Sequence, residues 1–198
     1  MDISQKSFSN KTRFEFGEEN LGFTVEDKSG SQSFIVAYGS IPTDVGMIEE
    51  KNIWYRNVGL LWSLIGFFIM AQSYLSHGEL IGSFWFILGI GCLIVYWVVK
   101  TRYTVIDTQK GRLFIINNEQ RDIIMEEIDT RRKGQWYSWY GTINFENQPS
   151  NEINKYIWLL EKDVISEKEY NESVSQIISY HNLKLTSSES DWSERTMN

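Results

Sequence analysis

Few residues in this chain of 198 could carry out acid–base, nucleophilic or metal chemistry. The two histidines, His77 and His181, fall on opposite sides of the membrane predicted below, so they cannot share a metal ion or a catalytic triad. The single cysteine, Cys92, lies in an apolar run, and a thiol buried in lipid is a poor nucleophile.

Acidic residues occur as three adjacent pairs, Glu18-Glu19, Glu49-Glu50 and Glu126-Glu127. Neighbouring side chains of a strand point to opposite faces, so we expect each pair to be solvated and not to converge on one ligand. No glycine-rich phosphate loop is present in the sequence. The residues therefore predict no catalytic site, no cofactor and no metal site.

One stretch combines cations with aromatic rings and is the candidate binding site. It comprises Arg131, Arg132, Lys133, Trp136, Tyr137, Trp139 and Tyr140. Its aromatics could fill the core of a small domain, it could bind anionic lipid head groups, or it could bind a protein, because Trp, Tyr and Arg are favoured in interfaces. In a strand, Trp136 and Tyr140 would share one face, and Tyr137 and Trp139 the other. We expect one face to pack in the core and the other to be free.

These residues must be positioned relative to two long apolar runs. No Asp, Glu, Lys or Arg occurs from Asn57 to Gly78, and after Glu79 none occurs from Leu80 to Val99. At about 1.5 Å per residue each run forms a helix about 30 Å long, which is the thickness of the hydrocarbon core of a bilayer. The sequence predicts a transmembrane hairpin over 53–99, with spans 54–74 and 80–99. The alternative, two buried helices of a soluble protein, would normally show a polar stripe.

Glycines occur seven residues apart in both runs, as Gly59 and Gly66 and as Gly82 and Gly89. Small residues on one helix face let two backbones approach closely in lipid, so we predict that the helices pack along these faces. The alternative is that glycine is simply common in membrane helices.

Charge is distributed unevenly along the chain. Residues 1–50 carry a net charge of −5, residues 51–145 of +3, and residues 146–198 of −5. Lys51, Arg56, Lys100 and Arg102 flank the spans, whereas the turn between them has no Lys or Arg. By the positive-inside rule both termini are cytosolic, and we expect a two-span protein of the bacterial inner (cytoplasmic) membrane. The acidic balance argues against nucleic-acid binding.

Both flanks of the hairpin show the alternating pattern of strands. We expect a flexible N-terminus over 1–12, the first part of a cytosolic β domain over 13–52, and its second part over 100–150, with strands that include 123–128 and 141–145. Residues 23–27 resemble 103–107, and 34–36 resemble 114–116, either as a weak internal repeat or by chance. We predict that 14–41 pairs with 101–145 in one sheet.

Over 151–183 the spacing of apolar residues changes to that of a helix, and we predict a helical hairpin there. Ser166 to Glu169 has the pattern of a capping box that starts its second helix. The polar tail over 184–198 is expected to be disordered. The predicted fold class is an α+β membrane protein: a two-helix transmembrane hairpin inserted in a small antiparallel β domain, followed by a C-terminal α-hairpin.

Two resemblances follow from these segments. The strands Tyr103-Thr-Val-Ile-Asp107 and Gly111-Arg-Leu-Phe-Ile-Ile116 after two spans resemble bacterial membrane proteins with a pleckstrin-homology-like (PH-like) domain, over residues 14 to about 160. That resemblance implies a curved sheet closed by a C-terminal helix, for which 153–162 is the candidate. Leu159 to Tyr170, with Ile177-Ile178, resembles a short C-terminal helical-hairpin module appended to bacterial proteins, which typically has glycine at Asp163 and lysine near Ser173. It implies oligomerisation or docking.

The function expected from the sequence is therefore that of a non-enzymatic inner-membrane protein whose β domain binds a protein partner. A regulatory subunit, an adaptor and a toxin-immunity protein all fit this description, and homo-oligomerisation is left open. The alternative is a lipid-head-group-binding or membrane-stress module, and an enzyme ranks third.

Overall fold

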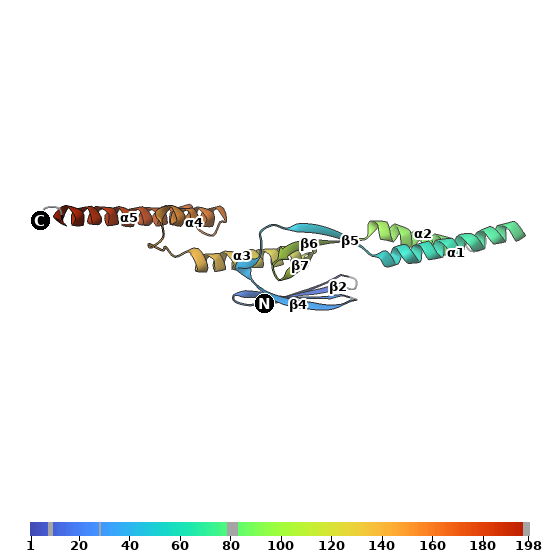
Figure 1. Cartoon of the computed structure of the whole chain (residues 1–198). Coiled ribbons are helices and arrows are strands. Elements are labelled where there is room, and N and C mark those ends of the chain that lie inside the picture. Colours follow the sequence, from blue (N-terminus) through green and yellow to red (C-terminus); the bar gives the residue numbers. More distant parts are fainter. Residues whose placement is uncertain (8–9, 28, 79–82, 196–198) are drawn as a thin grey trace.

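The computed structural model describes residues 1–7, 10–27, 29–78 and 83–195, which form an α+β protein with two antiparallel sheets. The described part is elongated (Figure 1). The helices α1 (Ile53–His77) and α2 (Ser83–Val98) lie at one end and the sheets in the middle. The helices α4 (Pro149–Glu161) and α5 (Glu167–Arg195) lie at the other end.

The first sheet contains the strands β1 (Asp2–Ser7), β2 (Asn10–Phe16), β3 (Asn20–Asp27) and β4 (Gly30–Ala37), in that order and all antiparallel. The flexible N-terminus expected over 1–12 is wrong, because β1 pairs with β2 along its whole length. The buried Gln5 explains the error. Its side-chain amide donates to the carbonyl oxygen of Ile116 at 3.0 Å, and its oxygen accepts from the Ile116 N–H at 2.9 Å, so a polar residue faces the core.

The second sheet contains β5 (Gly46–Lys51), β6 (Lys100–Thr108) and β7 (Gly111–Ile116), again antiparallel. Strand β5 precedes the two apolar helices and β6 follows them, and Lys51 is paired with Lys100. The single sheet predicted to join 14–41 with 101–145 is therefore wrong. The strands β1 to β4 pair with one another, and β6 pairs with β5 and β7.

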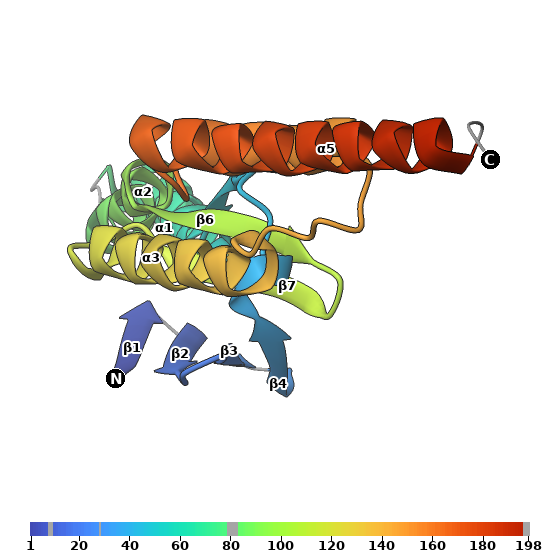
Figure 2. The same ribbon diagram turned by 90° about the vertical axis from the view of Figure 1, so that its left-hand side faces the viewer.

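Both sheets nevertheless contribute to one hydrophobic core, which is closed by α3 (Gln120–Tyr140). Figure 2 shows the first sheet facing α3 and the second sheet. The core includes Phe14, Phe23 and Val36 from the first sheet, Ile106, Leu113 and Ile115 from the second, and Ile124 and Ile128 from α3.

The helix α3 replaces the strand predicted over 123–128, and residues 141–145 hold no strand. Its buried positions, Ile124, Ile128, Arg132 and Trp136, are four residues apart, as one face of a helix requires. An arginine occupies one of these positions, so the apolar helical stripe is interrupted in the sequence. The strand predicted over Trp136 to Tyr140, in which successive side chains would alternate between two faces, is therefore wrong.

Helices form in both apolar runs, as predicted. The side chain of Asn52 caps α1 by accepting from the Trp54 N–H at 3.0 Å, and Gly78 ends it in the left-handed region, with φ of 70°. Within the described residues one helix, Ile53–Ser76, is long and apolar enough to cross a membrane, and little of it is buried. The apolar helix Ser83–Val98 is shorter, and residues 80–82, with which the second predicted span begins, lie outside the described residues.

The predicted close packing of α1 and α2 is confirmed at three glycines. A Cβ at Gly66 would overlap the backbone of Phe86, and a Cβ at Gly89 would overlap the backbone of Ser63. A Cβ at Gly59 would lie 2.8 Å from the side chain of Leu93. Gly82 lies outside the described residues.

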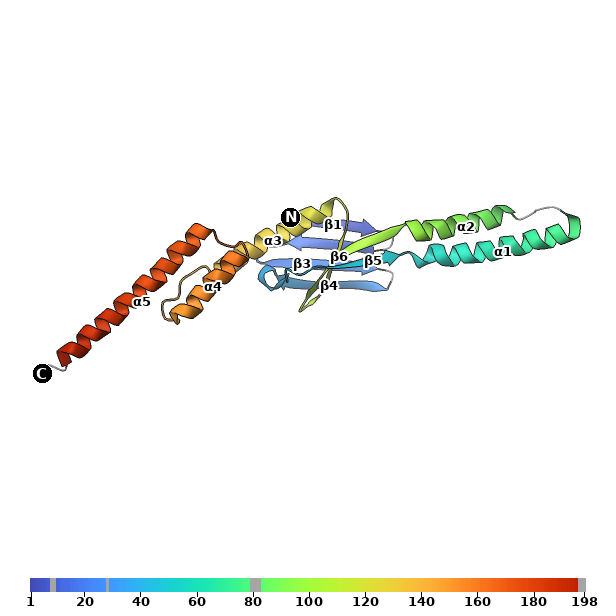
Figure 3. The ribbon, with the colours of Figure 1, turned by 90° about the horizontal axis from the view of Figure 1, so that it is seen from above.

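The helices α4 and α5 form the predicted helical hairpin around their own small core of Tyr156, Leu159, Ile165 and Ile177 (Figure 3). The capping box is confirmed, since the Ser166 N–H donates to Glu169 Oε2 at 2.8 Å and the Glu169 N–H donates to Ser166 Oγ at 3.3 Å. Asp163 has a φ of 52°, the left-handed conformation for which glycine is favoured.

Two further expectations for the C-terminal region are wrong. The helix at 153–162 belongs to α4 and packs on α5, whereas α3 closes the core between the sheets. The tail expected to be disordered over 184–198 continues α5 as a helix to Arg195, and residues 196–198 lie outside the described part.

Candidate functional site

The first cation of the basic-aromatic stretch attaches α3 to the loop after β2. Arg131 Nε lies 2.6 Å from Glu127 Oε1, and the guanidinium also donates to the carbonyl oxygen of Gly17. The guanidinium carbon is 5.8 Å from the ring centroid of Phe16 and 5.7 Å from that of Tyr38. Burial raises the pKa of the Tyr38 phenol, although the Arg131 charge lowers it in part. Arg131 therefore contributes mainly to packing inside the chain.

The second and third cations share one carboxylate. Arg132 is buried, pairs with Asp129 and donates to the carbonyl oxygen of Pro42 at 3.0 Å. Lys133 Nζ lies 3.1 Å from the other carboxylate oxygen of Asp129. Burial raises the pKa of Asp129, but hydrogen bonds from Lys133 and Arg132 outweigh it, and the net pKa is lowered. All three cations of the stretch are thus engaged by groups of the chain itself.

The first aromatic residue, Trp136, belongs to the core side of α3 and is 8% exposed. Its indole N–H donates to the carbonyl oxygen of Gly39 at 3.0 Å. Its ring centroid lies 5.0 Å from that of Trp158 on α4, in an edge-to-face arrangement. Trp136 therefore fixes the end of α3 against both the 3-10 turn η1 (Tyr38–Ser40) and α4.

The other three aromatic residues of the stretch are open to solvent. Tyr137 is 50% exposed, Trp139 48% and Tyr140 41%. The ring of Trp139 covers Gly39 so closely that a Cβ there would overlap it. The rings of Trp139 and Tyr140 meet edge to face with centroids 6.1 Å apart. The structure therefore divides the stretch between one buried and three exposed rings.

A cavity of about 410 Å³ lies beside Tyr140, the one exposed ring of the stretch that lines it; the lining comprises Gly39, Trp136, Tyr140, Lys155 and Trp158. The ring centroids of Tyr140 and Trp158 are 5.7 Å apart. Gly39, Lys155 and Trp158, which come from η1 and α4, were not predicted as site residues. Residues 153–160 show a helical period, but nothing in that pattern places the helix against the end of α3.

This aromatic surface, defined as Trp139, Tyr140, Trp158 and the cavity that the last two line, lies at the end of the sheets that faces away from α1 and α2. Figures 1 and 3 show α3 running from the sheets toward α4, with α1 and α2 on the opposite side. Its geometry suits an apolar or aromatic side chain of another molecule, since the walls are rings and one cation, Lys155, stands at its edge.

One carboxylate in each of two acidic pairs is paired with basic side chains. Glu49 lies 3.2 Å from Lys100 Nζ and 2.9 Å from Arg102 Nε, and the hydrogen bond from Lys100, followed by that from Arg102, lowers the pKa of its carboxyl. Glu127 pairs with Arg131 as described above. These contacts connect neighbouring strands or successive helix turns.

No protein-family model, no curated protein and no solved structure matches the chain. A functional proposal therefore depends on the contacts described above.

Proposed function

We propose that the chain is a non-enzymatic protein of the bacterial inner membrane, anchored by α1 and α2 as a transmembrane hairpin, whose cytosolic PH-like region binds a protein partner. The observation that carries this proposal is the aromatic surface. Two exposed rings of α3, Trp139 and Tyr140, belong to this surface and Tyr140 lines the cavity, while the neighbouring cations of the stretch are engaged within the chain.

Membrane insertion is supported by the outward-facing side chains of both apolar helices. Leu64, Phe68 and Ile87 are among many large apolar residues that are exposed. A soluble protein rarely exposes so large an apolar patch, whereas lipid would cover it. The flanking Lys51 and Lys100 favour cytosolic termini.

The PH-like assignment is supported by the architecture of the described residues. Two antiparallel sheets enclose one core, and the helix α3 that follows the last strand closes it. The resemblance implied a curved sheet closed by a C-terminal helix, and α3 takes the place expected for 153–162. The hairpin is inserted between β5 and β6, within the second sheet.

Protein binding is favoured over lipid binding for this surface. Trp and Tyr side chains at the rim of a cavity are typical of residues that dominate binding energy in protein interfaces. Lipid head groups would need free cations near the bilayer, but Arg131, Arg132 and Lys133 are paired, and the surface faces away from the hairpin. The C-terminal hairpin supports docking or self-association, because Ile178 and Leu183 of α5 are exposed.

The proposal is tested by comparing the full chain with its Tyr140→Ala variant in affinity capture from cells and in titration of the captured protein. Loss of a central aromatic should weaken binding by about 2 kcal/mol, or roughly thirtyfold. The matched control is Ile123→Ala, an exposed residue on the other end of α3. Equal binding by Tyr140→Ala would contradict the aromatic surface as the binding site. Salt-sensitive binding to anionic vesicles that Arg131→Gln abolishes would favour the lipid-binding alternative.

A further inference from the structure

The strand pairing gathers cations on one face of the second sheet, at the end next to α1 and α2. Lys51 is directly opposite Lys100, and Glu49 is directly opposite Arg102. Residues opposite each other in an antiparallel pair share a face, and so do residues two apart along one strand. Glu50 therefore points to the other face. The contacts of Glu49 with Lys100 Nζ at 3.2 Å and with Arg102 Nε at 2.9 Å agree with this assignment.

Positive charge exceeds negative charge on this face, which we call the basic face. It carries Lys51, Lys100 and Arg102 against the single carboxylate of Glu49. Glu49 pairs with Lys100 and Arg102, whereas in the described part of the chain no carboxylate forms an ion pair with Lys51. Like charges directly opposite each other on a sheet are destabilising. An anion bound near Lys51 and Lys100 would relieve that repulsion.

The cations of the basic face keep hydrogen-bond donors for such an anion. The side chain of Arg102 is 60% exposed and donates to Glu49 through Nε, and no described residue accepts from its two Nη groups. An arginine fork of this kind suits two oxygens of a phosphate. Lys100 directs one of its three N–H donors to Glu49. Lys51 and Arg102 are diagonal neighbours, a spacing of about 7–8 Å between backbones that their long side chains can bridge.

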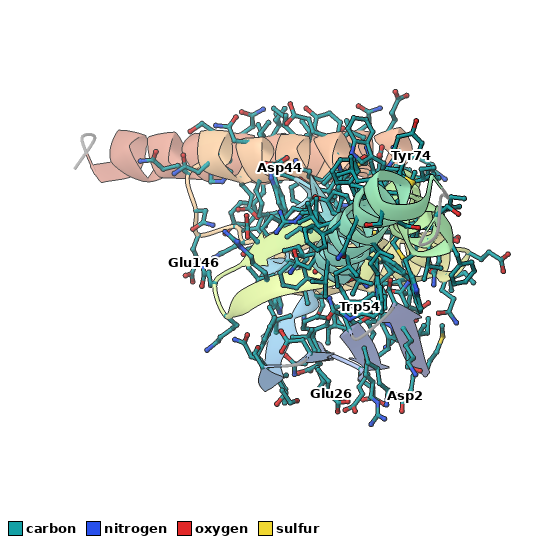
Figure 4. The ribbon with its side chains drawn as sticks, turned by 90° about the vertical axis from the view of Figure 1, so that its right-hand side faces the viewer. Asp2, Glu26, Asp44, Trp54, Tyr74 and Glu146 are labelled. Carbon is teal, nitrogen blue, oxygen red and sulfur yellow. The ribbon has the colours of Figure 1, made fainter. Side chains whose placement is uncertain are left out.

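The basic face lies at the level where the hairpin would leave a bilayer. One residue separates Lys51 from α1, and one residue separates α2 from Lys100. The Lys51 ammonium lies 5.5 Å from the ring centroid of Tyr96 and 5.7 Å from that of Trp97, both on α2. Figure 4, viewed along the hairpin, places Trp54 between the apolar helices and the first sheet. Since Trp and Tyr gather at the level of the lipid head groups, an anion reaching Lys51 would come from a head group.

We propose that the basic face binds the head group of an anionic phospholipid such as phosphatidylglycerol, with its phosphate between Lys51 and Arg102. The oxygens of a phosphate diester only accept hydrogen bonds, which matches a face whose unused groups are N–H donors. A zwitterionic head group would add its own ammonium where positive charge is already in excess. The inference rests on the proposed function only in taking α1 and α2 to lie in the membrane.

The test is a calorimetric titration of the full chain in a neutral detergent with dihexanoyl phosphatidylglycerol and, separately, with dihexanoyl phosphatidylcholine. We expect the anionic lipid to bind about tenfold more tightly or better at low salt, and the difference to shrink at high salt. Lys51→Gln and Arg102→Gln should each weaken phosphatidylglycerol about fivefold, the equivalent of about 1 kcal/mol per charge.

The matched control is Arg112→Gln, at the end of the second sheet that is far from the hairpin. Arg112 also pairs with an acid across two strands, and its side chain is 62% exposed, close to the value for Arg102. Its replacement breaks the same kind of ion pair without touching the basic face. Phosphatidylglycerol affinity should therefore stay unchanged.

Glu49→Gln distinguishes a ligand site from a structural cluster. The variant removes two ion pairs, but it also removes the negative charge of the basic face, so phosphatidylglycerol should bind about fivefold more tightly even if the melting temperature falls. Weaker binding by Glu49→Gln, equal affinity for the two lipids, or unchanged binding by Lys51→Gln and Arg102→Gln would overturn the proposal. Glycerol phosphate binding as tightly as the lipid would overturn the lipid as ligand. None of these outcomes depends on the aromatic surface, and insertion of the hairpin is tested separately by cysteine labelling.

Discussion

The indole nitrogen of Trp136 lies 3.0 Å from the carbonyl oxygen of Gly39, and this hydrogen bond joins the end of α3 to the turn that follows the first sheet. The guanidinium of Arg132, one turn earlier, donates to the carbonyl oxygen of Pro42 beyond that turn. Helix α3 therefore holds the connection between the two sheets as well as their shared core.

Trp136→Ala should destabilise the fold strongly. Removing a buried Trp leaves a void and a carbonyl without its donor, and we expect the free energy of unfolding to fall by roughly 3–5 kcal/mol. Trp139→Ala removes a ring that is half exposed and should cost clearly less. Chemical denaturation of both variants, followed by circular dichroism, checks this difference, and equal losses would contradict the assignment of one ring to the core.

Gly89→Ile should separate α1 from α2, because a side chain there would overlap the backbone of Ser63. Gly91→Ile is the control, since a Cβ at Gly91 meets no atom within 4 Å. Thermal unfolding in detergent should show a lower midpoint for the first variant and an unchanged one for the second. The same midpoint for both would show that close helix contact is dispensable.

Stability should fall at acidic pH through the buried Glu152. Burial raises the pKa of this carboxyl, but hydrogen bonds from Asn147, Lys155 and the Asn144 N–H outweigh it, so that the net pKa lies below the ordinary value of 4.5. A lowered folded-state pKa stabilises the fold above 4.5, and this contribution disappears as the pH drops through the folded-state value. Glu152→Gln should be less stable than the parent at neutral pH, and the difference should shrink as the pH falls. A constant difference would assign the effect to packing alone.

The membrane topology is tested by labelling engineered cysteines in a Cys92→Ala background. Ser76→Cys, near the end of α1, should react with an impermeant reagent from outside intact cells. Ser33→Cys, exposed on β4, should react only after lysis. Labelling of both positions from the same side would refute a hairpin with cytosolic termini.

The sequence was most informative where a pattern was uniform. Long uncharged runs identified α1 and α2, and the Ser166–Glu169 pattern identified the start of α5, because each depends on local chemistry alone. It failed where a polar side chain occupies a core position. Gln5 in β1 and Arg132 in α3 both donate hydrogen bonds to buried carbonyl groups of distant segments, and no local sequence pattern predicts such partners.

The candidate site was predicted in part. The stretch 131–140 does contain exposed aromatics, but its cations are paired within the chain, and Trp158 was missed because it comes from another helix. The strand alternation expected over 136–140 does not hold, since a strand repeats every two residues and α3 repeats about every 3.6. Trp136 and Tyr140 nevertheless line one cavity, because they are four residues apart on the helix. The sheet partners of 14–41 depended on long-range packing that periodicity does not encode.

The pairing of Lys51 with Lys100 has a mechanical consequence. A single residue, Asn52, separates β5 from α1, and a single residue, Val99, separates α2 from β6. Because each strand is joined to its helix by one residue, and the two strands are hydrogen-bonded while the two helices pack together, rotation of the hairpin relative to the second sheet is restricted. On the proposed membrane insertion, a tilt of the hairpin set by bilayer thickness or tension would therefore be transmitted to the second sheet and would reorient the β region together with the distant aromatic surface.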